Sequence, residues 1–330
     1  MKKFFPLSAV VIATAAVLVS APSASAVTQH PLVTDLKTAV TFGFAAGESA
    51  ENITVNPDGS ATVSLIGSVP PGSSNVQPKL ERISPSGHRT VLVTGQPGEA
   101  ILGNTRGRDG TIYYNVMSTD PSRFGVWALP SGGTPHRIGA LPPDGFPNGL
   151  TIDSSGHTLY AADSEKSTIW AIPASGGTAI AWLTDPALAP LPSSSFPLGA
   201  NGVRFHNSAV WVSNTDQGTL SRVPVTYSGK AGRIELVSSS VTGIDDFNFL
   251  SARADVVFAA LNGQNEVAVV HRDGTTNTVL TEADGLDSPT STAVCGDRLF
   301  VTNAGFAAPN ETKLLQAKIN LSSLFGKAVF

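Results

Sequence analysis

The stretch NGLTIDSSGHTLYAAD at residues 148–163 decides the fold, because its pattern returns five more times along the chain. A clear copy has an apolar residue at its third position, then a turn containing Gly or Asp, then a short strand-like run. The other copies start at Glu51, Ile101, Asn201, Asp245 and Thr290. Consecutive starts are 44 to 53 residues apart, a spacing typical of repeat architectures.

Each copy is followed by two further strand-like runs that are joined by a tight turn. One example is STIWAIPASGGTAIAWL at residues 167–183, where ASGG separates two alternating apolar runs as a hairpin loop does. Four short strands in each unit of 40 to 50 residues are typical of a β-propeller blade. The sequence therefore predicts an all-β fold, a single six-bladed β-propeller of four-stranded blades over residues 37–330.

The sequence also predicts where three segments outside the recurring strands lie in this ring. The extended segment at residues 37–44 should supply an outer strand to the last blade, since an open ring would leave sheet edges exposed. The Pro/Ser-rich segments at residues 69–76 and 187–196 are expected to lie between strands of the same unit. We expect both of them to cap one face of the propeller.

The first 26 residues have the features of a signal peptide. Lys2 and Lys3 precede an apolar run at residues 9–19, and Ala24-Ser25-Ala26 has the small-x-small pattern of a cleavage site. We therefore expect residues 1–26 to be removed and the mature chain to be secreted, either outside the cell or into the periplasm or cell envelope.

The composition limits the classes of partner that we expect for this protein. The net charge is −4 and no Lys/Arg cluster occurs, so we expect no nucleic-acid partner. Beyond the signal peptide no apolar run approaches 18 residues, so we expect no membrane span. One cysteine cannot form an internal disulfide. The sequence contains no HExxH, GxSxG, CxxC, Walker A or GxGxxG motif. We expect a monomer that takes a small-molecule substrate.

Propeller geometry brings the first positions of the six repeats to one central channel. Four of these six positions carry oxygen donors: Glu51, Asn148, Asn201 and Asp245. Carboxylate and amide oxygens are the ligands of a hard cation, which predicts a Ca²⁺ or Mg²⁺ site at these residues. The alternative is that Asn-Gly and Asp-Asp are ordinary turn dipeptides that lead into a strand.

Three segments resemble the SMP-30/gluconolactonase/LRE-like family over residues 40–310. They are PNGLTIDSSGHTLYAADS (147–164), GANGVRF (199–205) and GESAENI (47–53). The resemblance implies a six-bladed propeller with one divalent cation, commonly Ca²⁺, in its channel, and in many members lactonase activity. It places the family's metal-binding glutamate on Glu51, its substrate-side asparagine on Asn148, its metal asparagine on Asn201 and its metal aspartate on Asp245.

The chain departs from the family pattern at several positions. Glu48 also matches the family glutamate by context, but Glu51 keeps the distance to the following strand. The family's sugar-binding arginine falls on Phe146, which favours a more apolar substrate. Asp246, next to Asp245, is a further candidate ligand or base.

These features suggest an enzyme, a secreted cation-dependent hydrolase of a lactone or similar ester. Its expected catalytic residues are Asp245 or Asp246 as general base and Asn148 as the group that orients the carbonyl. Loops near Arg106, Phe146 and Phe196 should line the mouth of the channel. Two alternatives stay open, a non-hydrolytic cyclisation-type catalyst on the same propeller and a non-catalytic binding propeller with a structural ion.

Overall fold

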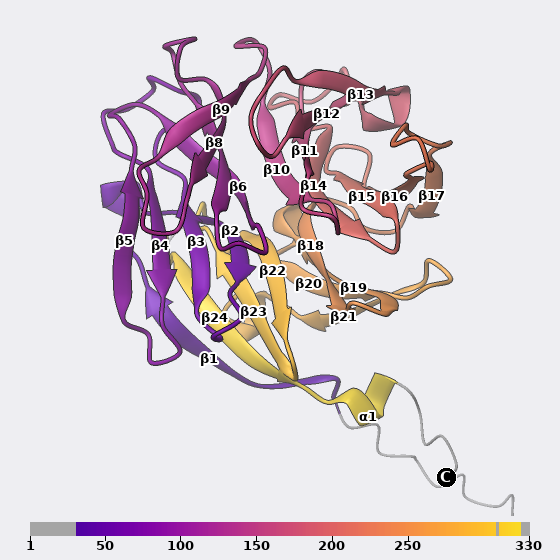
Figure 1. Cartoon of the computed structure of the whole chain (residues 1–330). Helices are drawn as coiled ribbons and strands as arrows, with labels where there is room; N and C mark the ends of the chain where they lie inside the picture. Colours follow the sequence, from indigo (N-terminus) through magenta and orange to yellow (C-terminus); the bar gives the residue numbers. More distant parts are fainter. Residues whose placement is uncertain (1–30, 308–309, 325–330) are drawn as a thin grey trace, which may run out of the picture. The chain divides into compact units, whose positions relative to one another are not determined.

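Six antiparallel sheets of four strands each make up the fold (Figure 1), as expected from the repeats. The computed structural model describes residues 31–307 and 310–324. The predicted signal peptide lies outside these residues. Among the described residues, no helix has the length and apolar character needed to cross a membrane.

Five of the blades follow the chain from their first strand to their fourth. Blade 1 contains β2 (Ala50–Val55), β3 (Ala61–Leu65), β4 (Lys79–Ile83) and β5 (Arg89–Thr94). Blade 2 contains β6 (Ala100–Arg106), β7 (Ile112–Met117), β8 (Gly125–Leu129) and β9 (His136–Ala140). Blade 3 contains β10 (Pro147–Ile152), β11 (Thr158–Asp163), β12 (Thr168–Pro173) and β13 (Ile180–Thr184).

The remaining blades repeat the plan. Blade 4 contains β14 (Ala200–His206), β15 (Ala209–Asn214), β16 (Thr219–Pro224) and β17 (Glu235–Ser238). Blade 5 contains β18 (Ile244–Ser251), β19 (Ala254–Leu261), β20 (Glu266–Val270) and β21 (Thr276–Leu280). Blade 6 contains β22 (Pro289–Cys295), β23 (Arg298–Asn303), β24 (Lys313–Ile319) and β1 (Val33–Thr41). The short helices are η1 (Phe44–Ala46), η2 (Pro186–Leu188), η3 (Asn262–Gln264), η4 (Glu282–Asp284) and α1 (Leu321–Leu324).

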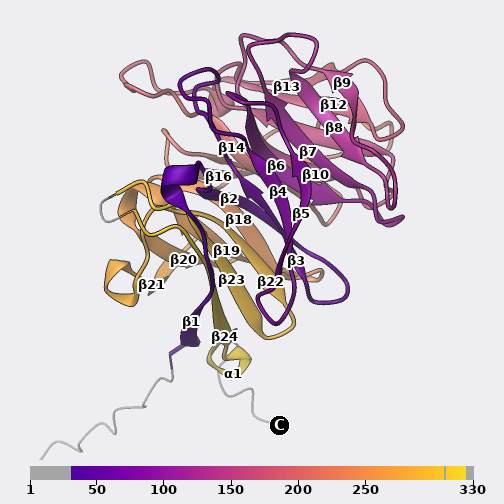
Figure 2. The same cartoon turned by 90° about the vertical axis from the view of Figure 1, so that its left-hand side faces the viewer.

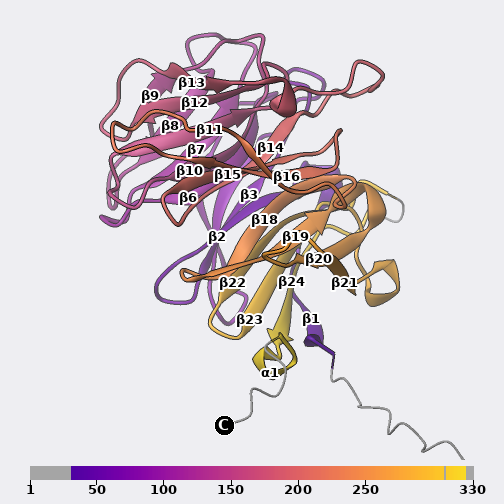
Figure 3. The ribbon, with the colours of Figure 1, turned by 90° about the vertical axis from the view of Figure 1, so that its right-hand side faces the viewer.

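The last blade closes the ring with strands from both parts of the chain. β1 pairs with β24 in antiparallel register, and the two strands lie side by side in both side views (Figure 2 and Figure 3). The expected outer strand is thus present, although it starts at Val33 rather than at Lys37. This pairing covers the edge of β24 that would otherwise expose unpaired backbone groups.

The first strands of successive blades pack against one another, from β2 through β22 and back to β2. They therefore surround a central channel. The apolar core of the described residues is divided into six clusters, one at each contact between neighbouring blades. Leu102 and Leu150, for example, meet between blades 2 and 3. Each blade is consequently buried on both faces by its neighbours.

The Asn-Gly pairs at the channel have a packing role and are not turns. Gly149 and Gly202 lie inside β10 and β14. A Cβ on Gly149 would lie 2.5 Å from the backbone oxygen of Asn201, and one on Gly202 would lie 2.3 Å from a carboxylate oxygen of Asp246. Glycine is needed here because neighbouring first strands approach more closely than a side chain allows.

We expect Gly149→Ala to lower the free energy of unfolding by about 1–3 kcal/mol, the usual cost of overpacking a tight interior. Gly263→Ala is the matched control, because the nearest atom to its added Cβ would be 3.9 Å away. Urea denaturation of both variants measures the difference. Equal losses in the two variants would contradict the close-approach argument.

Candidate functional site

A cavity of about 650 Å³ opens at the end of the channel where the first strands begin. The four predicted ligand residues all line it: Glu51, Asn148, Asn201 and Asp245. Each is the second residue of its strand, in β2, β10, β14 and β18. The sequence alignment of the repeats therefore matches a shared structural position, and the four side chains reach one space.

The two carboxylates at this cavity are crowded and buried. The exposed fraction is 7% for Glu51 and 9% for Asp245. Burial and the nearby charge of Asp246 raise the pKa of Glu51 to about 8. Burial, together with the charges of Glu51 and Asp246, raises the pKa of Asp245 well above its ordinary value, against a lowering contribution from Asn201. Among the residues that the structure describes, no Lys, Arg or His lines the cavity, so none of these lining side chains offers the two acids a positive charge.

The two amides are held in one orientation by hydroxyl groups. Asn201 Nδ2 donates to Thr215 Oγ1 at 2.9 Å, and Thr215 Oγ1 donates to the backbone oxygen of Ile244 at 2.6 Å. Asn148 Nδ2 lies 3.5 Å from Ser164 Oγ, which donates to the backbone oxygen of Ala200 at 2.7 Å. With its nitrogen turned to a hydroxyl, each amide keeps its oxygen available as a ligand.

Ser164 and Thr215 were not found from the sequence, although the repeat contains a signal for them. Each directly follows the second strand of its blade. Asn262 takes the same position in blade 5, after β19, and lines the cavity. In the part of the chain that the structure describes, its Nδ2 is buried and has no hydrogen-bond partner. Aligning the repeats by their second strands would have shown four polar residues at this position, because Ser118 follows β7 in the same way.

The side chains of Glu48 and Glu51 have different environments. Glu48 does not line the cavity; it forms ion pairs with Lys79 at 2.5 Å and Arg89 at 2.9 Å. Burial acts to raise the pKa of Glu48, but hydrogen bonds from Lys79, from the Gly43 backbone and from Arg89 lower it to about 2. Glu48 is already neutralised by protein groups, whereas Glu51 is not. This agrees with the choice of Glu51 as the candidate ligand.

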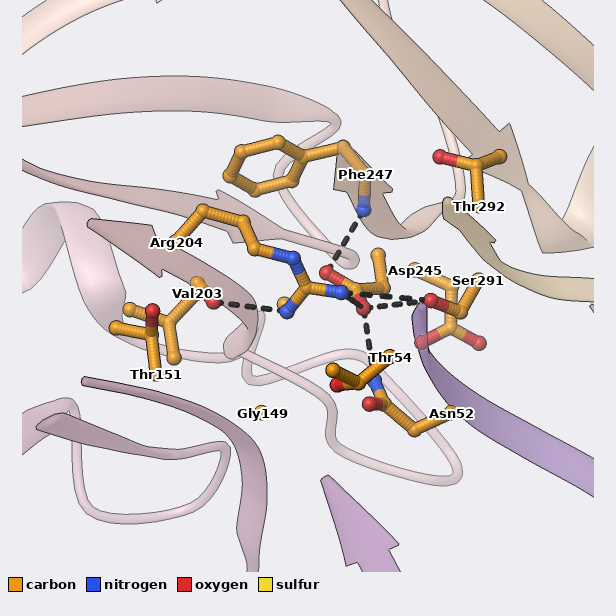
Figure 4. Close-up of polar contacts among 12 residues, drawn as sticks. Asn52, Thr54, Gly149, Thr151, Val203, Arg204, Asp245, Phe247, Ser291 and Thr292 are labelled. Carbon is orange, nitrogen blue, oxygen red and sulfur yellow. Dashed lines mark hydrogen bonds and ion pairs between the residues drawn. The ribbon is translucent and has the colours of Figure 1, made fainter. Parts of the chain in front are cut away.

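The carboxylate of Asp246 is paired with other side chains. Its carboxylate accepts hydrogen bonds from Asn52 Nδ2 and Ser291 Oγ, both at 2.7 Å, and forms an ion pair with Arg204. Figure 4 shows the guanidinium of Arg204 together with the Asn52 and Ser291 side chains. Asp246 does not line the cavity. Its carboxylate is thus engaged by protein groups, so Asp245 is the better placed of the two candidate bases, and a catalytic role of Asp246 stays an untested prediction.

The network around Asp246 divides the channel. Asn52, Asp246 and Ser291 are the third residues of their strands, one step below the candidate ligands. A second cavity of about 220 Å³, lined by residues further along the strands, including Thr54 and Arg204, lies beyond it. The large cavity therefore has a polar floor.

The mouth of the cavity matches the expectations in part. Phe146 and Phe196 line it as expected, with ring centroids 6.0 Å apart at 87°. Both Pro/Ser-rich segments contribute, through Val69 and Phe196 among others. Residues 187–196 connect blade 3 to blade 4 rather than lying inside a blade.

Arg106 was expected at this mouth and is not there. It is the last residue of β6, at the far end of the strand from the cavity, and donates to the Gly110 backbone oxygen. Six residues of strand separate it from the start, about 20 Å. The expectation failed because it did not consider in which direction the strand runs.

The donor set of the cavity fits a hard cation. Two carboxylates and two amide oxygens are typical ligands of Ca²⁺, which takes oxygen donors from Asp, Glu and Asn. No described residue donates a hydrogen bond to the Glu51 side chain. Within residues 31–307 and 310–324, no group of three or more His, Cys, Asp or Glu is placed to hold a metal ion, so the amides are needed to complete the set.

The fold and this cavity define a class, a six-bladed propeller with an acidic, amide-lined pocket at one end of its channel. In comparisons with known proteins, no protein family and no curated protein matched the chain. Similar solved structures include regucalcin from Agrobacterium tumefaciens, a calcium-binding protein, with 18% identity over 83% of this chain and 92% of that one, at a TM-score of 0.60.

Two further solved structures have the same fold. A candidate gluconolactonase has 15% identity over 87% of this chain and 92% of that one, at a TM-score of 0.62. Virginiamycin B lyase from Staphylococcus aureus has 15% identity over 87% of this chain and 99% of that one, at a TM-score of 0.55. At these sequence identities, the structural similarity establishes the fold of the chain. The six-bladed propeller implied by the resemblance is confirmed.

Proposed function

We propose that this chain is a divalent-cation-dependent hydrolase of a lactone or similar ester, related to the SMP-30/gluconolactonase-like propellers. The observation that carries the proposal is that two buried acids, Glu51 and Asp245, share a cavity with two oriented amides, while none of the described lining residues is cationic. The similar folds of regucalcin and a candidate gluconolactonase support it. We also propose that residues 1–26 direct secretion and are then removed.

Glu51, Asn148, Asn201 and Asp245 would hold the cation, Ca²⁺ or Mg²⁺. When bound, such an ion polarises an ester carbonyl and lowers the pKa of a water molecule. The Asn148 amide has a second N–H besides the one turned to Ser164, and this N–H orients the substrate by donating to the carbonyl oxygen.

Asp245 serves as the general base. An Oδ atom of Asp245 takes a proton from the attacking water as the water oxygen bonds to the carbonyl carbon. The bond from that carbon to the leaving oxygen then breaks, and the same proton passes to the leaving oxygen. In its ionised form, which a bound cation favours over the protonated form, the Asp245 carboxylate can accept this proton.

The test is a panel of aliphatic, aromatic and sugar lactones, assayed with Ca²⁺ and with a chelator. We expect ring opening that stops in the chelator and returns with added cation. Reactions in ¹⁸O-labelled water separate hydrolysis, which incorporates the label, from elimination or cyclisation, which does not. Label-free products would contradict the hydrolase and support the cyclisation-type alternative. Saturable binding without any product would support the binding propeller.

The stability of the metal-free protein should depend on pH. Without metal, both acids are easier to protonate in the folded chain, because burial and repulsion raise the pKa of Glu51 to about 8 and that of Asp245 as well. The stabilisation that Glu51 contributes is therefore complete below its ordinary pKa of 4.5 and is lost as the pH rises through about 8. The raised pKa of Asp245 acts in the same direction. Metal-free protein should melt at a lower temperature at high pH.

Added Ca²⁺ should reverse this loss, since it replaces the protons. Free ion at 100 times its Kd stabilises a folded protein by about 2.7 kcal/mol. We expect the Ca²⁺-induced rise in Tm to be large near pH 9 and small near pH 5, and to be absent in Glu51→Gln. Melting curves in chelator and in excess Ca²⁺ measure it. A rise of the same size at both pH values, or no rise at either, would argue against the site.

A further inference from the structure

The wall of the cavity is aromatic. Four phenylalanines line it, and they come from four separate segments: Phe44 in η1, Phe146 before β10, Phe196 between blades 3 and 4, and Phe306 after β23. The cavity is also lined by the apolar residues Val69, Val76 and Leu198. Segments that are distant in sequence thus place apolar side chains around one opening.

Three of these rings are open to solvent. The exposed fraction is 36% for Phe44, 49% for Phe196 and 50% for Phe306. Exposing rings at one opening is unfavourable in water, and a rim of apolar residues around a concave site is typical of ligand binding. The Phe196 ring is also oriented, because it meets the edge of the buried Phe146 ring at 87°.

The polar groups of the cavity exclude two classes of ligand. A carboxylate or phosphate would meet Glu51 and Asp245, and within the described part of the chain no Lys, Arg or His lies on the wall to pair with it. A sugar lactone would leave several hydroxyls without partners against phenylalanine, and an unpaired polar group costs free energy when it is buried. The remaining class is a neutral molecule with one polar end and a bulky apolar part.

We propose that the cavity binds an uncharged ester or lactone that carries a large alkyl or aryl substituent. The substituent lies between Phe146, Phe196 and Phe306, and the carbonyl lies at the acid and amide end. A volume of about 650 Å³ is in the range of sites for small organic ligands, roughly 300–1,000 Å³. The position of the carbonyl rests on the proposed function, whereas the preference for an apolar substituent rests on the wall alone.

The test is equilibrium binding to metal-free full-length protein, measured by calorimetry with a series of δ-lactones of increasing alkyl chain length. We expect one saturable site, with Kd falling roughly four-fold for each methylene that becomes buried. Glucono-δ-lactone and a lactone whose chain ends in a carboxylate should bind at least ten times more weakly than the matching alkyl lactone.

Phe196→Ala tests the wall directly. The residue is half exposed in a connecting segment, so the variant should fold, and it should raise the Kd of the longest alkyl lactone by roughly ten-fold. Tyr227→Ala is the matched control, because Tyr227 is a fully exposed aromatic residue that does not line the cavity; its Kd should equal that of wild type. The same Kd for all chain lengths, or equal effects of the two variants, would overturn the proposal.

The outcome is independent of hydrolysis. Chain-length-dependent binding without turnover in the presence of Ca²⁺ would contradict the hydrolase and leave the ligand class standing. Turnover of glucono-δ-lactone without any preference for alkyl lactones would support the hydrolase and overturn the ligand class.

Discussion

Asp245→Asn and Glu51→Gln are each expected to abolish lactone or ester turnover in a propeller that remains folded. Both substitutions keep the size of the side chain and remove one of the two negative charges at the cavity. The remaining charge holds a divalent cation weakly, and Asp245→Asn also removes the base. We expect losses of more than about 100-fold, at least the effect of losing one oxyanion-hole donor. Initial rates and Ca²⁺ titrations of the purified variants measure them.

Glu48→Gln is the matched control for Glu51→Gln. It makes the same chemical change only three positions away, but Glu48 is paired with Lys79 and Arg89 outside the cavity. Its turnover should equal that of wild type, although its melting temperature should fall because the lowered pKa of Glu48 reports a stabilised carboxylate. If Glu48→Gln lost activity while Glu51→Gln kept it, the assignment of the two acids would be reversed.

Arg204→Met is expected to lower the free energy of unfolding by about 3–5 kcal/mol, because it leaves the Asp246 carboxylate buried without its cation. The exposed fraction of the side chain is 11% for Arg204 and 3% for Asp246. The hydrogen bonds from Asn52 and Ser291 remain but carry no positive charge. Urea denaturation of the variant measures the loss.

Two further variants show whether the loss comes from the buried charge. Arg222→Met removes the partner of Glu235, whose side chain is 52% exposed, and should cost at most about 1 kcal/mol. Adding Asp246→Asn to Arg204→Met removes the unpaired charge and should recover part of the stability. A loss for Arg204→Met no larger than that for Arg222→Met would show that water or other groups neutralise Asp246.

Much of the fold could be predicted because the signals are local. The turns and the period-two runs lie within a few residues of one another, so each blade could be recognised by itself. The repeat also located the second residue of each first strand, and with it Glu51, Asn148, Asn201 and Asp245. The position of a residue within its repeat predicts its depth along the channel, because six copies of one unit around an axis place equivalent residues at equivalent depth.

The sequence alone could not show which of two neighbouring acids faces the cavity. Asp245 and Asp246 are adjacent, and adjacent residues of a strand point in different directions. The packing of β18 between β14 and β22 decides which one faces the cavity. The partners of Asp246 come from three other blades, and Asn52 lies 194 positions away in the chain. No local sequence pattern therefore predicts these contacts.

The sequence by itself determined the number of blades, the strand that closes the ring and the level of the candidate site, since these follow from repeat length, turn residues and alternation. Only the tertiary structure decided the environment of the site. It neutralised Glu48 and Asp246 with Lys79, Arg89 and Arg204, placed Glu51 and Asp245 in a cavity where no described residue supplies a cationic side chain, and gathered four phenylalanines at one opening. The physical reason is that charge compensation and burial depend on contacts between different blades, which form only when the ring closes.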